Sequence, residues 1–155
     1  MAFRDYEEFI GSLDAHGVRY LLIGAHAVAL HARPRATKDL DVLLDAAPAN
    51  LVRALEALRA FLGTDLGYDV ADLADPDAIV QLGVAPVRID LVSAIPGCPD
   101  FAAAWRRRVD APFGAVSAHY LGLDDLIRAK RASDRAQDRA DVQSLERARR
   151  GRRGR

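Results

Sequence analysis

Two aspartates separated by one residue stand in the apolar segment Thr37–Asp45. Read as a β-strand, the segment places Asp39 and Asp41 on one face and Leu40 and Val42 on the other, because side chains alternate along a strand. Two carboxylates this close repel each other, and a cation between them relieves the repulsion. Carboxylate oxygens are the ligands of Mg²⁺ and Mn²⁺. The spacing therefore favours a divalent metal site, and an edge strand with a solvated polar face is the alternative.

A third acid is expected on another strand. Residues 86–93 also alternate and place Arg88, Asp90 and Val92 on one face, opposite Val87, Ile89 and Leu91. Neighbouring strands lie about 4.8 Å apart. If this strand lies beside the first with the same face up, Asp90 converges with Asp39 and Asp41. Two metal ions about 3.5 to 4 Å apart at such a site can clamp the attacking and leaving oxygens of a phosphoryl displacement.

A phosphate-binding turn is expected upstream of these strands. The apolar run at residues 18–23 ends at Gly24, and a short helix is expected from Ala25 to Ala32. A strand that turns through glycine into a helix offers unpaired N–H groups and a positive dipole to an anion. A purely steric need for glycine is the alternative. Lys38, Arg88 or Lys130 is expected to neutralise the negative charge that develops during a phosphoryl displacement.

The same periodicities define the elements that position these groups. Helices are expected at residues 3–15, 25–32, 49–61, 101–109, 124–131 and 136–146. Strands are expected at 18–23, 37–45, 78–82 and 86–93, the last two as a hairpin, with a final strand or loop at 112–119. This order predicts an α/β (α+β) fold, in which helices pack a mixed β-sheet and a helical segment follows. Residues 1–146 are expected to form one domain.

Charge is distributed unevenly along a chain whose formal net charge is zero. Residues 1–125 hold 11 basic and 18 acidic side chains, whereas residues 126–155 hold 11 basic and 4 acidic ones. The basic end suits a polyanion. Residues 147–155 include six arginines and two glycines, so this segment is expected to be a disordered tail.

The sequence also predicts where the protein works. Cys98 is the one cysteine, which excludes an intramolecular disulfide and disfavours a cysteine-based zinc site. No apolar run approaches the roughly 18 to 20 residues of a membrane span, and the first residues lack a secretory pattern. A soluble cytoplasmic protein without a membrane partner is therefore expected.

Three motifs in order carry a family resemblance. Ile23-Gly24-Ala25, then Asp39-Leu40-Asp41-Val42, then Arg88-Ile89-Asp90-Leu91 resemble the polymerase-β-type minimal nucleotidyltransferase superfamily. Within it, the likeness extends to the small bacterial proteins grouped with toxin–antitoxin and abortive-infection nucleotidyltransferases. Residues 126–132 followed by 138–141 resemble the helical end of that group. The resemblance spans roughly residues 18 to 146.

The resemblance implies transfer of a nucleoside monophosphate from an NTP to a hydroxyl of a tRNA, a protein or a small molecule, with two Mg²⁺ ions. Asp39 and Asp41 would bind both ions, and Asp90 would bind the catalytic ion and help activate the hydroxyl. Lys130 would contact the phosphates. It also implies a toxin or antitoxin partner. Ala25 departs from the serine or glycine usual there, because it keeps the backbone N–H but has no hydroxyl.

Two other function classes remain open on the same residues. A non-catalytic module that binds a nucleotide or RNA, or an antitoxin, is motivated by Ala25 and the basic end. A metal-dependent hydrolase or nuclease also uses aspartates clustered on strands, although this chain lacks the histidine ligands that such sites often recruit.

Overall fold

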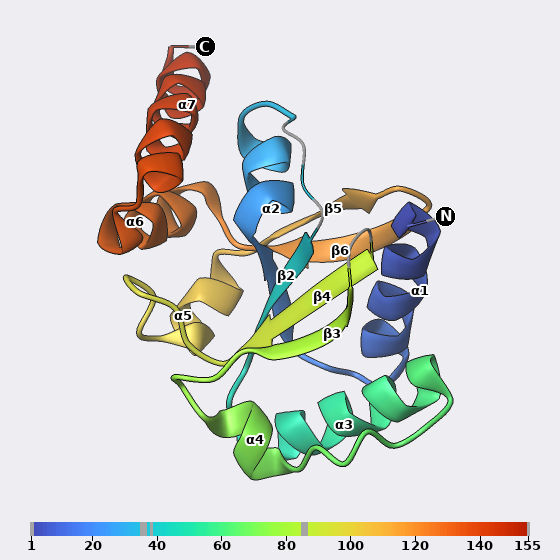
Figure 1. Cartoon of the computed structure of the whole chain (residues 1–155). Helices are drawn as coiled ribbons and strands as arrows, with labels where there is room; N and C mark the ends of the chain where they lie inside the picture. Colours follow the sequence, from blue (N-terminus) through green and yellow to red (C-terminus); the bar gives the residue numbers. More distant parts are fainter. Residues whose placement is uncertain (1, 35–36, 38, 85–86, 155) are drawn as a thin grey trace.

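A mixed sheet organises the chain (Figure 1). The computed structural model describes residues 2–34, 37, 39–84 and 87–154, and within them six strands form one sheet in the order β3-β4-β2-β1-β6-β5. The strands are β1 (Tyr20–Ile23), β2 (Asp39–Leu44), β3 (Val80–Val84), β4 (Val87–Val92), β5 (Val109–Phe113) and β6 (Val116–Tyr120).

Helices surround this sheet. They are α1 (Ala2–Ala15), α2 (Gly24–His31), α3 (Pro48–Leu62), α4 (Val70–Ala74), α5 (Phe101–Arg106), α6 (Leu123–Ser133) and α7 (Ala136–Arg153). In Figure 1, α1 and α3 lie together on one side, and α6 and α7 pack on each other on the other side. No described helix is long and apolar enough to cross a membrane.

Burial follows the predicted periodicity. In α1, Phe9, Ile10 and Leu13 share one face and are buried. Pro48 occupies the first turn of α3, where its missing N–H is no loss. The amide of Asn50 then donates to Arg19 and Asp45 carbonyls, which anchors α3 to the strand ends.

The pairing of β2 determines the site. It lies antiparallel to β1 and parallel to β4, so that Asp41 pairs with Asp90 and Asp39 pairs with Arg88. The strand of Asp90 therefore lies beside the strand of Asp39 and Asp41, which is the condition for the three aspartates to lie near one another. Leu40 is fully buried on the opposite face, which prevents a one-residue slip from turning the aspartates inward.

Two expectations differ from the structure near the C-terminal half. Val109 was expected in a helix and residues 112–119 in one strand or loop, but α5 ends at Arg106 and Val109 begins the β5–β6 hairpin. Pro112, which lowers the strand signal, is tolerated because β5 is an edge strand.

The other difference concerns the basic end. Disorder was expected from Arg147, whereas α7 continues to Arg153. Arginine is a good helix former, and tertiary contacts fix this end. Arg149 pairs with Asp124 at 3.1 Å, and Arg152 donates to the His31 carbonyl at 3.1 Å.

Candidate active site

Three carboxylates meet where β2 and β4 run side by side. Asp41 and Asp90 are direct partners across the two strands, and Asp39 lies two residues before Asp41 on the same face. Asp90 is buried, with 9% of its surface exposed, whereas the Asp39 side chain is 30% exposed. The three aspartates therefore lie on neighbouring strands and line one cleft.

The aspartates open into a cleft of about 530 Å³. This volume is within the range of small-molecule sites. One wall comes from the sheet and Gly24, another from residues 76–79 and 94–96, and the third from α6 and α7, with Lys130 and Arg135.

Arg88 supplies the nearest positive charge to the carboxylates. Its Nη2 donates to Asp39 Oδ2 at 2.9 Å and to Asp90 Oδ2 at 3.1 Å. The other oxygen of Asp90, Oδ1, is buried and has no hydrogen-bond partner among the described residues. One oxygen of the Asp90 carboxylate can therefore still accept a hydrogen bond or bind a cation.

Asp41 has a perturbed acidity. Burial raises its pKa from 3.8 to about 6, with further contributions from the negative charges of Asp90 and Asp39, against the opposing effect of Lys130 and Arg88. Such perturbation in a cleft is typical of functional residues.

The donor set fits a divalent cation in its chemistry. All three side chains offer carboxylate oxygens, as Mg²⁺ requires, and a cation would partner Asp90 Oδ1 and favour the ionised form of Asp41. In the arrangement seen here, no three His, Cys, Asp or Glu side chains of the described chain are grouped so as to hold a metal ion. The Arg88 guanidinium lies between Asp39 and Asp90 instead.

Gly24 is required by the close approach of Asp41. Its φ is +68°, and a Cβ placed on it would lie 2.2 Å from Asp41 Oδ2. Glycine therefore lets the start of α2 touch the carboxylate. Gly24 lines the cleft as expected, but Ala25 is buried and is not among the lining residues. The predicted cation Lys38 lies outside the described residues.

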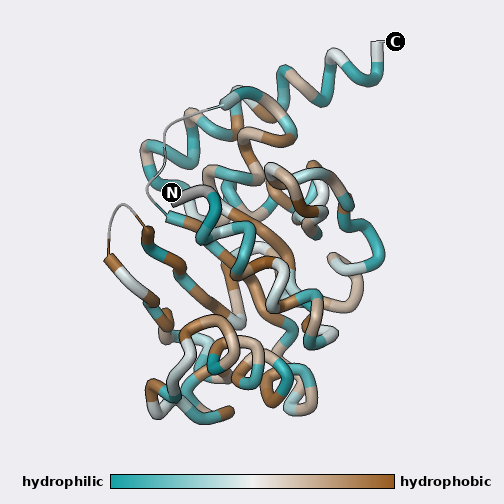
Figure 2. The backbone as a smooth tube through the Cα atoms, turned by 90° about the vertical axis from the view of Figure 1, so that its right-hand side faces the viewer, coloured by the Kyte–Doolittle hydropathy of each residue, from teal (hydrophilic) through white to brown (hydrophobic). Residues whose placement is uncertain are grey.

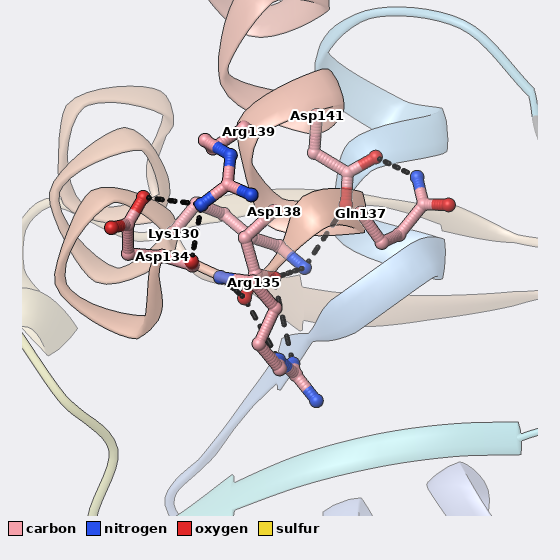
Figure 3. A network of polar contacts seen from close by, with 7 residues as sticks. All are labelled: Lys130, Asp134, Arg135, Gln137, Asp138, Arg139 and Asp141. Carbon is pink, nitrogen blue, oxygen red and sulfur yellow. Dashed lines mark hydrogen bonds and ion pairs between the residues drawn. The ribbon is translucent and has the colours of Figure 1, made fainter.

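Lys130 is held by two aspartates of α7 (Figure 3). Its Nζ lies 3.3 Å from Asp138 Oδ1 and 3.1 Å from Asp141 Oδ2. The Lys130 side chain is only 10% exposed, and both carboxylates are almost fully buried. Gln137 donates a further hydrogen bond to Asp141 at 3.0 Å. The lysine is therefore fixed at the cleft wall.

Arg135 joins this network and extends toward the strands in Figure 3. Its Nε donates to Asp138 Oδ2 at 2.8 Å. Burial acts to raise the pKa of Asp138, but hydrogen bonds from Arg135 and Lys130 outweigh it and hold that pKa below the ordinary value.

Sequence reasoning assigned no role to Arg135, Asp138 or Asp141. The sequence feature that could have identified them is the three-residue spacing of Asp138 and Asp141. This spacing places both aspartates on one helical face, after an amphipathic helix that contains Lys130.

The histidines of α2 are packing residues. The His26 ring contacts Tyr6 and Phe113, with ring centroids 5.8 and 5.1 Å away. His31 is buried, and its Nε2 lies 2.8 Å from the Leu121 carbonyl oxygen. Burial lowers the pKa of both imidazoles.

Comparison with known proteins agrees with this geometry at the level of the family. No curated protein gives a significant match to the chain. One family model matches residues 2–149, which include every element that lines the cleft. The chain therefore belongs to the family described as nucleotidyltransferase of unknown function (DUF6036).

Proposed function

We propose that this protein transfers a nucleoside monophosphate from an NTP to a hydroxyl acceptor, with Mg²⁺ or Mn²⁺ ions held by Asp39, Asp41 and Asp90. The observation that carries the proposal is the parallel register of β2 and β4, which brings the three carboxylates into one cleft. Membership of a nucleotidyltransferase family supports the reaction class.

In the proposed reaction, the acceptor oxygen attacks the α-phosphorus. A new P–O bond forms, the bond to the bridging oxygen of the β-phosphate breaks, and pyrophosphate leaves with that electron pair. On this proposal, the hydroxyl proton passes to the carboxylate of Asp90, which lines the cleft. Bound Mg²⁺ would stabilise the negative charge of the triphosphate.

Positive side chains of the cleft would bind the phosphates. Lys130 is fixed by its two aspartates, so it presents a charge without losing side-chain freedom on binding. Arg135 lines the same wall. Arg88 neutralises Asp39 and Asp90 in this structure, and on this proposal it turns to the phosphates once cations take its place. Gly24 would offer its backbone N–H at the start of α2.

To test this proposal, the protein is incubated with Mg²⁺ and each of the four NTPs in turn, labelled at the α-phosphate. The label that is transferred to RNA, protein and small-molecule fractions is then measured. Asp41→Asn should abolish transfer and pyrophosphate release. Asp65→Asn makes the same change on an exposed loop pair and should leave both unchanged. Equal transfer by Asp41→Asn and the unmodified chain would contradict the proposal.

The labelled fraction would also identify the biological setting. Label in a protein fraction would support a toxin or antitoxin partner, and label in tRNA would support an RNA acceptor. We place the reaction in the cytoplasm, where the lone Cys98 stays reduced.

A non-catalytic nucleotide-binding module is the second candidate. The specific observation in its favour is the Arg88 guanidinium, which already neutralises two of the three carboxylates. Calorimetric titration with each NTP, with and without Mg²⁺, separates the candidates. Binding that does not depend on Mg²⁺, without pyrophosphate release, would favour the module.

A further inference from the structure

The C-terminal half of α7 presents arginines that the cleft does not use. The inward face of α7 repeats every three or four residues as Asp138, Asp141, Leu145, Arg149 and Arg152, which are buried or bonded to α2 and α6. Arg147, Arg150 and Arg153 fall outside this repeat and are exposed. Figure 2 shows this end of the chain reaching away from the rest of the molecule. We call these three residues the arginine face.

The charge of the arginine face is uncompensated. None of its three arginines has an ion pair within the part of the chain that the structure describes. The acids of α7 are committed elsewhere, because Asp138 and Asp141 are buried and Glu146 pairs with Arg131 of α6. A solvent-exposed positive surface without carboxylates attracts polyanions.

A groove between α6 and α7 adjoins the arginine face. It has a volume of about 230 Å³, and its lining residues are Asp124, Ile127, Arg128, Arg131, Arg149 and Arg153. Arg153 therefore belongs to both surfaces. Three groove arginines already form ion pairs, Arg128 with Asp125, Arg131 with Glu146 and Arg149 with Asp124. Arg153 is thus the groove guanidinium that has no ion pair among the described residues, and its paired N–H donors match phosphate oxygens.

The helix also links this surface to the cleft. α7 begins beside Arg135 and Asp138, which line the cleft, and ends at Arg153. The eighteen residues of α7 rise about 1.5 Å each, about 27 Å in all. A flexible polyanion bound along the arginine face can therefore extend one end toward the cleft.

We propose that the arginine face and the adjoining groove bind the phosphate backbone of single-stranded RNA and present it as the hydroxyl acceptor. This inference rests on the proposed function. Single-stranded RNA fits because every ribose carries a 2′-hydroxyl, the kind of group that the reaction consumes. No aromatic side chain lines the groove, so base stacking contributes nothing there and binding is expected to be tolerant of sequence.

The test measures fluorescence anisotropy of an end-labelled 20-nucleotide single-stranded RNA with the full chain, from 50 to 300 mM NaCl, without NTP. Each phosphate contact contributes about 0.7 to the slope of log K against log salt for a single strand. Arg147→Gln/Arg150→Gln should therefore lower the slope by about 1.4 and weaken binding about 25-fold at 0.1 M salt. Glutamine is a good helix former, so α7 should persist.

A matched variant removes the same charge elsewhere. Arg4→Gln/Arg59→Gln alters two exposed arginines of α1 and α3 and should leave the salt slope unchanged. Arg147→Lys/Arg150→Lys keeps the charge and should retain most of the slope, which separates charge loss from helix loss. Equal slopes for the glutamine variant and its matched control would overturn the inference, and so would tighter binding of a DNA strand of the same sequence.

A catalytic variant separates this inference from the function on which it rests. Asp41→Asn should bind the RNA as tightly as the unmodified chain. If the unmodified protein binds RNA but transfers no label, the proposed function is refuted, whereas the RNA-binding surface is still supported. Transfer to protein or small molecules without RNA binding would refute only the RNA surface.

Discussion

Replacing Asp41 by asparagine should make the protein more stable at neutral pH when no divalent ion is present. Burial, and then the charges of Asp90 and Asp39, raise the pKa of Asp41 from 3.8 to about 6 in the folded chain. The ionised carboxylate is therefore unfavourable in the fold. Asparagine keeps the shape of the side chain beside Gly24 and removes the charge.

The size of the effect follows from the pKa. One step of pKa is worth about 1.36 kcal/mol, so a rise from 3.8 to about 6 corresponds to about 3 kcal/mol. Because the folded pKa is the higher one, this destabilisation is absent below about pH 4. It develops between about pH 4 and pH 6 and is complete above that range. Relaxation around the charge lowers the gain, so we expect about 1 to 3 kcal/mol at pH 8.

Urea unfolding followed by circular dichroism in EDTA measures this directly at pH 4, 6 and 8. Asp39→Asn is the matched control, because it removes an acceptor of Arg88 and should give no comparable gain. Addition of Mg²⁺ should stabilise the unmodified chain more than Asp41→Asn. A variant that is less stable than the unmodified chain at pH 8, or a gain that does not vary with pH, would refute this electrostatic account of the site.

Two further substitutions can each be compared with the same substitution at another position of the chain. Gly24→Ala should cost about 1 to 2 kcal/mol of stability, because alanine disfavours the left-handed backbone, and it should also displace Asp41 and so lower nucleotide transfer. Gly17 has a similar φ of +66° without a comparable clash. Gly17→Ala should therefore lower stability in thermal melts and leave nucleotide transfer unchanged. Lys130→Met removes the cation that Asp138 and Asp141 share, while Arg135 and Gln137 still bond to these carboxylates. It should cost about 3 kcal/mol, the lower end of the range for breaking a buried ion pair. Arg131→Met breaks an exposed pair worth about 0 to 1 kcal/mol, and equal losses in urea unfolding would show that the buried network contributes little.

The strands of the site were predictable because their pattern is local. Alternation placed Asp39 and Asp41 on one face, and a fully buried Leu40 on the other face fixes that orientation in the sheet. The partner strand also followed, since Arg88 and Asp90 show the same alternation. What periodicity cannot give is the side-chain contact between Arg88 and Asp39, because it depends on the register between segments 49 residues apart.

The C-terminal helices were harder to interpret for a related reason. Composition alone predicted disorder for a segment rich in arginine and glycine, yet Arg149 and Arg152 bond to α6 and α2 and continue α7. In the sequence, Asp138 and Asp141 contributed only to the family resemblance, and nothing indicated that they are buried. Their burial becomes apparent only when Lys130 is placed opposite them.

Helix α7 connects the cleft to the arginine face. Rotation of its inward face would separate Lys130 from Asp138 and Asp141 and so break two buried ion pairs, which is unfavourable. Lys130 also acts electrostatically on Asp41, since its positive charge lowers the pKa that burial raises. The same contacts therefore hold a cation near the Asp41 carboxylate and connect the arginine face to the cleft through one helix. If our two proposals hold, an acceptor bound to that face would be presented to the cleft by a rigid element, an arrangement that reduces the entropic cost of orienting two substrates.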